Sequence, residues 1–433
     1  MGISYELCVA TNNGLHIKLI ISSLKLWINC CISMEIKDSM ITFVREHASE
    51  DVNALRLKYS GKSNLSFDFP LDFALLQIEA RKKTRKKLSD FISHEDFIFP
   101  SLIAAEQASN QTIAKYHASF LQSGATVLDL TAGLGIDDMT FAGNGINVTT
   151  CEIEPLKCDV LRHNSAVMGV EKNLKVVNID SIDYLCNNKE RYDAVFADPA
   201  RRDTAGGKVH ALADCQPDIL KALSDIMNVT DRLIVKCSPL LDLTFIRETV
   251  SDLAHIHIVC FRGECKEVLI EIMKDAVFTG VSVVDLDSER VISSFQTHFS
   301  PISNRELIIY VSRKSPIDYN YLYEPNSGVM KTGDWVALQS LYPDLNKVDS
   351  NTHLFLSDTL YLNFPGRVTR LEISFDKKML KTLNGKKLNV VSRNHPLSAP
   401  MIYSKYNIIP GSDSFLYAFR YNGKPYYVST TLT

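Results

Sequence analysis

Residues 127–138, Val-Leu-Asp-Leu-Thr-Ala-Gly-Leu-Gly-Ile-Asp-Asp, constrain the fold of this chain more than any other stretch. The apolar first residues predict a buried strand, and Gly133 and Gly135 predict a tight turn into a helix that begins near Ile136. Asp129 stands at the carboxyl end of that strand. In open α/β sheets such a unit binds small molecules, because glycine lets a ligand approach the backbone and free N–H groups favour negative groups.

Strands and helices alternate after this stretch, which is typical of a parallel sheet. The apolar runs predict strands at residues 126–130, 147–152, 174–180, 192–198 and 232–237, and a helix at residues 155–167. Two further runs, residues 256–261 and 267–272, are joined by a turn at Gly263 and predict a closing antiparallel hairpin. The sequence therefore predicts an α/β fold with a Rossmann-like core.

The segments that flank this core have different patterns. With 433 residues the chain is too long for one ordinary core, so two or three domains are expected. Residues 34–100 have a helical pattern, and residues 276–433 are β-rich with recurring Gly, Pro and Asn turns. Residues 1–33 are interpreted as an extension outside the fold, which a start codon placed at Met1 instead of Met34 would explain. The net charge of −3 neither favours nor excludes a nucleic acid partner.

The ten cysteines are scattered without a Cys-x-x-Cys pair, so no structural metal site is expected. Cys151 and Cys260 lie in apolar strand-like runs, which suits reduced buried thiols in a cytoplasmic protein. Residues 15–34 are largely apolar, but Lys18 and Lys25 interrupt them, so a membrane span is not expected. This stretch also lacks a clear small-residue cleavage site for a secretory signal.

Four acids end four successive predicted strands: Asp129, Glu152, Asp180 and Asp198. The carboxyl ends of parallel strands meet at one edge of a sheet, where α/β proteins bind ligands, although each acid alone also suits an ordinary strand end. A carboxylate at Glu152 can accept hydrogen bonds from both hydroxyls of a ribose. An acid at Asp180 can accept a hydrogen bond from an adenine amino group.

The turn that contains Thr131, Gly133 and Gly135 is expected to hold the amino acid part of S-adenosylmethionine. An NAD site shares the ribose acid, but its fingerprint requires a third glycine, and Asp138 occupies that position. An extra acid is tolerable beside a cationic sulfonium and awkward beside a pyrophosphate. The residues therefore favour S-adenosylmethionine as the cofactor.

Asp198-Pro-Ala-Arg-Arg202 follows the fourth predicted strand. Pro199 stiffens the turn, so the Asp198 carboxylate and nearby carbonyls face the sheet edge. Such a group can accept a hydrogen bond from a base amine and align its lone pair with a methyl group, since methyl transfer needs in-line positioning and desolvation more than strong base catalysis. Arg201 and Arg202 either contact a phosphate or base of the substrate, or pair with local acids such as Asp203.

Six of the seven residues at positions 81–87, the basic segment, are Lys or Arg. Two interpretations stay open, a solvated helix face and a face that contacts RNA phosphates. A second helical segment, residues 104–118, directly precedes the first strand and can be capped by Ser109 or Asn110. That segment is placed to fold over a ligand.

These motifs carry a family resemblance. The acid–glycine turn at residues 129–135, the strand-end acids and Asp198-Pro-Ala-Arg-Arg202 resemble the class I S-adenosylmethionine-dependent methyltransferases. Glu106-Gln-Ala-Ser-Asn-Gln-Thr-Ile-Ala-Lys-Tyr116 resembles the lead-in of trimethylguanosine-synthase-like RNA methyltransferases. The motifs at residues 321–326 (YLYEPN), 351–355 (NTHLF), 364–367 (FPGR) and 391–394 (VSRN) resemble bacterial proteins with a C-terminal THUMP-like domain.

The resemblance covers residues 34–433 and leaves the extension at residues 1–33 uncovered. It implies a helical part at 34–100, a methyltransferase core at 101–274, a small ferredoxin-like segment at 275–316 and a THUMP-like domain at 317–433. THUMP-type domains imply RNA binding. The expected reaction is methyl transfer to RNA, tRNA or rRNA, with a guanine amino group as the acceptor. The alternatives are a small-molecule methyltransferase and an RNA-binding protein that holds the cofactor without turnover.

The sequence departs from related enzymes at two places. Amino-group methyltransferases often follow the acid–proline pair with a second proline and an aromatic residue that stacks on the base, but Ala200 and Arg201 occupy those positions. Cys237 ends the fifth strand, where uracil-C5 methyltransferases place a nucleophile. The pattern around Cys237 differs from theirs, so a buried structural thiol is the preferred interpretation.

Overall fold

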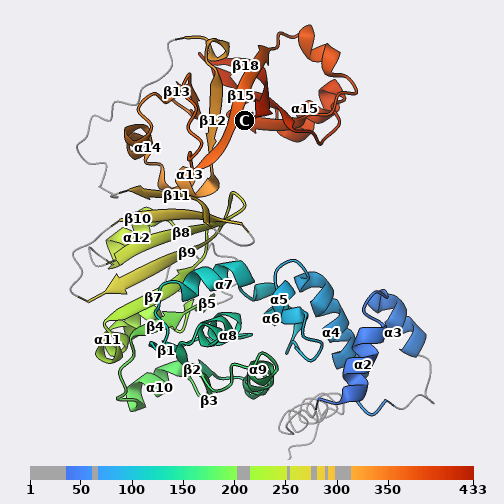
Figure 1. Cartoon of the computed structure of the whole chain (residues 1–433), viewed down its shortest axis with the longest axis vertical. Coiled ribbons are helices and arrows are strands. Elements are labelled where there is room, and N and C mark those ends of the chain that lie inside the picture. The colour runs from blue at the N-terminus through green and yellow to red at the C-terminus, as the bar shows by residue number, and fades with distance from the viewer. Residues whose placement is uncertain are drawn as a thin grey trace, which may run out of the picture. The chain divides into compact units, whose positions relative to one another are not determined.

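The computed structural model describes residues 36–60, 67–201, 215–250, 254–274, 280–287, 291–297 and 314–433. The chain divides into two compact units, residues 1–193 and residues 194–433. The predicted extension at residues 1–33 lies outside the described part of the chain. Figure 1 labels the elements of both units.

The first unit begins with helices, as the pattern of residues 34–100 predicts. Their apolar faces bury an aromatic cluster of Phe43, Tyr59, Phe67 and Phe69, with ring centroids 5.1 to 5.8 Å apart. Short helices need such packing, because they are marginal in isolation. The helices are α2 (Asp38–Glu46), α3 (Val52–Ser60), α4 (Leu71–Thr84), α5 (Ser89–Ile92), α6 (Leu102–Gln107) and α7 (Gln111–Ala118).

The rest of the first unit alternates strands and helices. Its strands β1, β2 and β3 are parallel and lie in that order, with Asp129 opposite Thr150 and Glu152 opposite Asn178. The predicted helix at residues 155–167 is α9. The elements are β1 (Thr126–Asp129), α8 (Ile136–Gly143), β2 (Asn147–Glu152), α9 (Pro155–Val167), β3 (Leu174–Asn178) and α10 (Ser181–Asn187).

An extended segment, residues 97–99, links the helical part to α9. The Gln77 amide of α4 bonds both the N–H and the carbonyl of Phe99, at 2.8 and 2.9 Å. The Asn164 amide of α9 bonds both the N–H and the carbonyl of Ile98, at 2.9 and 2.8 Å. All three residues of the segment are buried. The two amides therefore replace the partner strand that this buried backbone lacks.

The second unit begins with a sheet whose strands lie in the order β11-β10-β8-β9-β7-β4. β4 is parallel to β7, and β8 and β9 form the predicted antiparallel hairpin, whose turn residues Arg262 and Gly263 have φ of 53° and 80°. The segment expected to be ferredoxin-like contributes β10 and β11, which extend this sheet. The elements are β4 (Ala194–Ala197), β5 (Ala200–Arg201), β6 (Cys215–Gln216), α11 (Ile219–Val229), β7 (Arg232–Cys237), α12 (Leu243–Val250), β8 (Ala254–Phe261), β9 (Glu264–Met273), β10 (Val281–Leu286) and β11 (Val291–Thr297).

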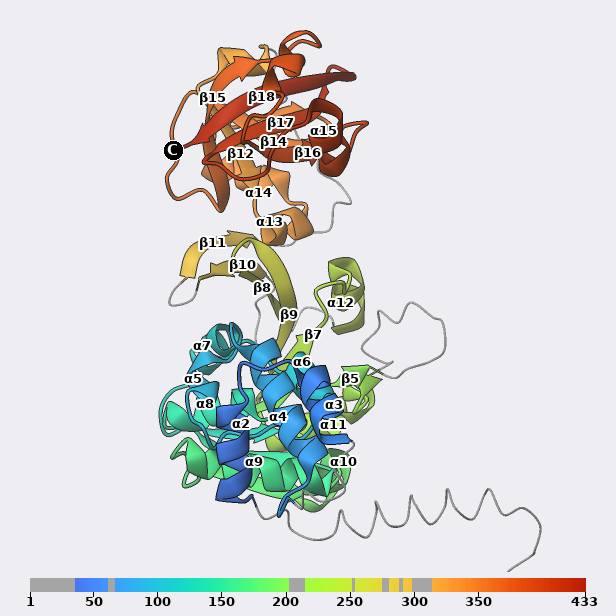
Figure 2. The same ribbon diagram turned by 90° about the vertical axis from the view of Figure 1, so that its right-hand side faces the viewer.

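Residues 314–433 of the second unit form a second sheet, in the order β13-β14-β12-β15-β18-β17-β16 (Figure 2). Alternate residues of β17 enter two separate apolar clusters, Tyr417 and Phe419 in one and Leu416 and Ala418 in the other, so both faces of the sheet are covered. The elements are the 3-10 helices at Pro316–Asp318 and Met379–Leu383, β12 (Tyr321–Pro325), α13 (Ser327–Thr332), α14 (Trp335–Leu341), β13 (Asn346–Asp349), β14 (Thr352–Ser357), β15 (Gly366–Ser374), β16 (Asn389–Arg393), α15 (Ala399–Tyr406), β17 (Ser414–Tyr421) and β18 (Lys424–Leu432).

Candidate active site

The turn after β1 is built around Asp129. Its carboxylate accepts hydrogen bonds from the N–H of Thr131, at 2.6 Å, and from the Thr131 hydroxyl, at 3.1 Å. Gly133 and Gly135 have φ of 57° and 75°, in the left-handed region that glycine favours. A Cβ at Gly135 would lie 2.2 Å from a methyl carbon of Leu161, so a larger residue at the start of α8 would have to displace this side chain. The three residues predicted to hold the amino acid part of a cofactor, Thr131, Gly133 and Gly135, thus share one turn with Asp129.

Asp129 and Asp138 form a buried pair of carboxyls. Asp129 is 2% exposed and Asp138, in the first turn of α8, is 0% exposed. Neither carboxyl oxygen of Asp138 has a hydrogen-bond partner among the described residues, and the same holds for the hydroxyl of Thr150 on β2. Burial raises the pKa of Asp129 to about 7, and burial with the nearby Asp129 charge raises the pKa of Asp138 well above its usual range. Two buried like charges disfavour double ionisation, so the pair favours a state in which at least one of the two carboxyls is protonated.

Asp137, the residue before Asp138, is held by the segment that precedes β1. Its carboxylate lies 2.8 Å from Nδ1 of the buried His117 and accepts a hydrogen bond from the Ser109 hydroxyl. Asn110 caps α7 by accepting a hydrogen bond from the Thr112 N–H, which confirms one of the two predicted caps. Sequence reasoning missed Asp137 and His117, although an acid in the first turn of a predicted helix was a usable signal.

Glu152 ends β2, as predicted, and is 9% exposed. One of its carboxylate oxygens accepts a hydrogen bond from the Glu154 N–H at 2.9 Å. Its backbone carbonyl accepts hydrogen bonds from the Asn178 amide, at 2.8 Å, and from the Cys158 thiol, at 3.3 Å. These bonds fix the strand end, so the carboxylate is oriented before any ligand arrives. Its contact with a ribose stays a prediction.

Asp180 has a different place from the predicted one. β3 ends at Asn178, and Asp180 is the N-cap of α10, where its carboxylate accepts a hydrogen bond from the Ile182 N–H at 2.8 Å. The predicted strand end was two residues too long, because an N-cap adopts extended backbone before its helix begins. If Asp180 also accepts a hydrogen bond from an adenine amine, its carboxylate must do so while it caps α10.

Asp198 directly follows β4, and Pro199 beside it is buried. The Asp198 carboxylate forms an ion pair with Lys236 of β7, with Nζ 2.6 Å from Oδ2. The Lys236 side chain is 12% exposed, and its Nζ also lies 3.9 Å from the buried Glu267 carboxylate. Sequence reasoning missed Lys236, although a lysine inside the apolar run at residues 232–237 was a signal for a buried partner.

Three further predicted positions belong to this region of the second unit. Arg201 is described by its backbone, which pairs with Cys215, and Arg202 lies outside the described residues. Cys237 ends β7 as predicted, and burial raises the pKa of its thiol. A thiol that stays protonated suits a structural role better than that of a nucleophile.

Much of the basic segment is committed to local partners. The Arg81 guanidinium donates to four backbone carbonyls in residues 92–97. Lys83 forms an ion pair with Glu106 at 2.6 Å, and the Lys87 ammonium donates to the Glu106 carbonyl at 2.7 Å. For these three residues the structure therefore favours a solvated helix face with structural contacts over a face that contacts RNA phosphates.

Motifs of residues 314–433 converge on Glu324. This carboxylate of β12 is 7% exposed and accepts hydrogen bonds from Arg393, at 2.6 Å, Arg367, at 3.3 Å, and the Tyr417 hydroxyl, at 2.9 Å. A Cβ at Gly366 would lie 2.1 Å from the Glu324 carbonyl, which explains the glycine before Arg367. The two arginine side chains are 42% and 49% exposed. One buried carboxylate thus orients two cations that remain open to solvent.

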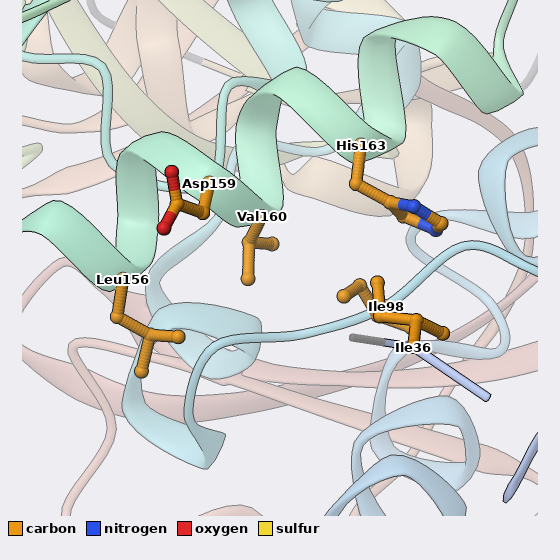
Figure 3. Close-up of a pocket in the computed structure, with 6 residues that line it drawn as sticks. All are labelled: Ile36, Ile98, Leu156, Asp159, Val160 and His163. Carbon is orange, nitrogen blue, oxygen red and sulfur yellow. The ribbon is translucent and has the colours of Figure 1, made fainter. Parts of the chain in front are cut away.

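A small apolar hollow lies along α9 of the first unit (Figure 3). None of the residues predicted to hold a cofactor lines it, and the His163 ring is committed to the Asp96 carbonyl at 2.7 Å. The residues that line the hollow are Ile36, Ile98, Leu156, Asp159, Val160 and His163.

Over the described residues, no group of His, Cys, Asp or Glu could hold a metal ion. No helix in the described part of the chain is long and apolar enough to cross a bilayer.

The fold is that of an α/β methyltransferase with a ferredoxin-like domain toward the C-terminus. A solved structure from Porphyromonas gingivalis W83, titled "putative methyltransferase", superposes with a TM-score of 0.77 at 24% identity and covers 92% of this chain and 100% of that chain. Residues 55–206 match the family model "Putative SAM-dependent methyltransferase". Residues 321–365 match a ferredoxin-like domain, inside the range where the THUMP-like domain is expected.

Two curated relatives each match part of the chain. An uncharacterized S-adenosylmethionine-dependent methyltransferase of Mycobacterium tuberculosis is 29% identical over 167 residues, which are 38% of this chain and 43% of that protein. Ribosomal RNA small subunit methyltransferase J of Francisella tularensis is 32% identical over 81 residues, 17% of this chain and 34% of that protein. The chain thus spans less than half the length of either relative. The family model and the first relative both name S-adenosylmethionine as the cofactor.

Proposed function

We propose that this protein is an S-adenosylmethionine-dependent methyltransferase that acts on RNA. The observation that carries the proposal is the turn after β1, where a left-handed glycine turn adjoins a buried carboxyl pair inside the region that matches the methyltransferase family. A buried carboxyl without a hydrogen-bond partner fits a cationic ligand and disfavours a pyrophosphate. The relative named for ribosomal RNA supports RNA as the substrate class.

The residues of the first unit would hold the cofactor, which supplies a methyl group on a positively charged sulfur. Asp129, Thr131, Gly133 and Gly135 would bind its amino acid part, because they lie in one turn that the hydrogen bonds between Thr131 and the Asp129 carboxylate hold together. The oriented carboxylate of Glu152 would accept hydrogen bonds from the ribose. The lone pairs of the Asp180 carboxylate that the cap does not use would accept a hydrogen bond from the adenine amine.

Asp198 and Pro199 would present the acceptor. A carboxylate held at 2.6 Å by a mostly buried lysine has little freedom to rotate, so it can direct a hydrogen-bonded amino group toward one position. Lys236 is thereby a positioning residue for Asp198. Arg201 and Arg202 would contact the substrate, with a guanine amino group of tRNA or rRNA as the acceptor. The exposed guanidiniums of Arg367 and Arg393 would add phosphate contacts.

Transfer of a tritiated methyl group to total RNA from a strain deleted for this gene tests the proposal. The expected result is label in RNA, with nucleoside mass spectrometry placing it on an N-methylated guanosine of tRNA or rRNA. Label that appears only in small molecules would instead select the small-molecule methyltransferase. RNA binding with no label at all, although the cofactor binds, would select the protein that holds the cofactor without turnover.

A further inference from the structure

The β8–β9 hairpin carries two thiols on opposite residues. Cys260 and Cys265 are register partners and flank the turn that contains Arg262 and Gly263. Both are free thiols. Opposite residues in antiparallel strands have Cα atoms about 4.5 to 5.5 Å apart, and a disulfide spans about 4.4 to 6.8 Å. The backbone of the hairpin therefore already suits a disulfide.

We propose that Cys260 and Cys265 are a reversible redox pair, which closes a disulfide across the β8–β9 hairpin on reaction with an oxidised low-molecular-weight disulfide. The pair is distinct from every residue assigned to the methyl transfer above. The proposal therefore stands or falls independently of the proposed function.

The two thiols differ in a way that assigns them separate steps. Cys265 is partly exposed, whereas Cys260 is 0% exposed. A hydrogen bond from the Cys260 thiol lowers the pKa of Cys265, and the Lys331 ammonium of α13 lowers it further. The same hydrogen bond, with burial, raises the pKa of Cys260. An accessible thiolate reacts first, so Cys265 is the attacking thiol and Cys260 is the resolving thiol.

The reaction balances as two thiol–disulfide exchanges. The Cys265 thiolate attacks one sulfur of the small disulfide, which forms a mixed disulfide and releases one small thiolate. That thiolate takes the proton of Cys260, and the Cys260 sulfur then displaces the second small thiolate from Cys265, which takes a proton from water. The protein loses two protons and two electrons, and the small disulfide gains them and becomes two small thiols. An excess of small thiol reverses both steps.

The pair lies where the hairpin contacts α13 of the same unit, which both views show beside this sheet (Figures 1 and 2). The Cys260 Sγ is 3.6 Å from the Ser327 hydroxyl, and the Ser327 N–H donates to the Gly263 carbonyl at 3.3 Å. A Cβ at Gly328 would lie 2.8 Å from the Cys260 Sγ, so the sulfur is closely surrounded. Closing the disulfide moves this sulfur closer to Cys265, and we expect the contact with α13 to weaken.

Peptide mapping of the full-length chain tests the pair directly. The protein is equilibrated in glutathione buffers of increasing oxidised fraction, alkylated and digested with trypsin. Arg262 and Lys266 follow the two cysteines, so the disulfide appears as peptide 248–262 linked to peptide 263–266. The linked pair should accumulate in oxidised buffer and disappear with dithiothreitol. The exposed Cys186 serves as the matched control, which should form only a mixed disulfide with glutathione.

The outcomes decide the proposal even if a variant folds poorly, because the wild-type map alone reports the disulfide. The proposal would be overturned if both thiols are still fully alkylated in a buffer that converts Cys186 completely to its mixed disulfide with glutathione. It would also be overturned if Cys260 links to other cysteines instead of Cys265. Cys265→Ser should abolish the linked peptide. Hydrogen exchange of residues 327–332 should rise on oxidation of the wild type but not of Cys265→Ser. Unchanged exchange in the oxidised wild type would remove the predicted effect on α13.

Discussion

The carboxyls after β1 and the carboxylate after β4 follow the same cue in the sequence, an acid at the end of an apolar strand, but their surroundings differ. After β1, Asp129 and Asp138 are buried beside each other, and Asp138 has no hydrogen-bond partner among the described residues. After β4, Asp198 is 42% exposed and pairs with Lys236 at 2.6 Å. The sequence pattern thus predicts where an acid lies, whereas the neighbouring side chains determine its protonation state and its freedom to move.

This difference matches the two tasks of the proposed reaction. A buried carboxyl pair with raised pKa values favours its ionised form when a cationic ligand binds beside it, because the cation compensates the negative charge. An ion-paired carboxylate has its charge compensated, so it serves better as an oriented hydrogen-bond acceptor than as a site for a cation. Substitutions at the two places should therefore separate binding of the cofactor from transfer of the methyl group.

The largest effect is expected at the carboxylate after β4. Asp198→Ala should lower methyl transfer by about 100-fold or more and leave cofactor affinity unchanged, because only the positioning of the acceptor is lost. Lys236→Met should lower transfer by a smaller factor. Tritium incorporation into RNA and calorimetric titration with the cofactor measure the two properties, with the exposed Asp231→Ala as a control. Full activity of Asp198→Ala would remove this residue from the reaction.

A smaller effect, on binding alone, is expected for the strand end of β2. Glu152→Ala should weaken cofactor affinity by about 10- to 100-fold, since hydrogen bonds to a charged group contribute about 1.5 to 3 kcal/mol each. The matched control is Glu154→Ala, whose exposed carboxylate pairs with Lys157 on the surface. Calorimetry measures both variants. Equal affinities of Glu152→Ala and wild type would sink the ribose assignment.

The carboxyl pair predicts a dependence on pH. The pKa of Asp129 is raised to about 7 in the folded chain, above its value of about 3.9 when unfolded. The folded state then binds more protons, so stability is highest below pH 4 with respect to this group and falls as the pH rises toward 7. Cofactor affinity should rise over the same range, because the ionised pair attracts a cation.

Asp138→Asn should flatten both profiles, because an amide does not ionise and removes the second negative charge beside Asp129. We expect the unfolding free energy at pH 8 to increase by about 1 to 4 kcal/mol relative to wild type, with little difference at pH 4. Thermal unfolding and calorimetry at several pH values provide the measurements. A wild-type affinity that does not change between pH 5 and 8 would contradict ionisation of the pair in this range.

The smallest effect is expected at Asp180, where a cap and a ligand contact compete. Asp180→Ala should cost about 1 kcal/mol of stability through loss of the cap, whereas Asp180→Asn should retain the cap. If the carboxylate also binds the adenine amine, both variants should weaken the cofactor a few-fold. If only Asp180→Ala differs from wild type, and only in stability, Asp180 is a cap and nothing more.

The strand-and-helix alternation of the core could be predicted because its strands are apolar and its turns carry glycine. α9 and the β8–β9 hairpin lie where the pattern placed them. The end of β3 could not be located, since the N-cap at Asp180 has the same extended backbone as a strand. The sheet position of β10 and β11 was also beyond the pattern, because pairing partners depend on contacts between distant residues.

The glycine turn after β1 could be predicted, because the local spacing of Asp129, Gly133 and Gly135 indicates it. The contacts of His117 with Asp137 and of Lys236 with Asp198 could not, because they depend on which side chains the fold brings together. The same holds for the raised pKa of the two buried acids. For the basic segment the sequence left two interpretations open, a solvated helix face and a face that contacts RNA, and the four backbone carbonyls bound by Arg81 favour the first at that residue.

The segment at residues 97–99 bears on how this molecule can be shortened or recombined. Its two neighbouring peptide groups are each held by an amide side chain, one from α4 and one from α9. A cut that removed residues before 101 would leave the buried Asn164 with two unmet hydrogen bonds and strip apolar cover from α9. The helical part is therefore not a detachable module. Truncated versions of this protein, and chimeras with homologous proteins, should therefore keep α4 through α9 together.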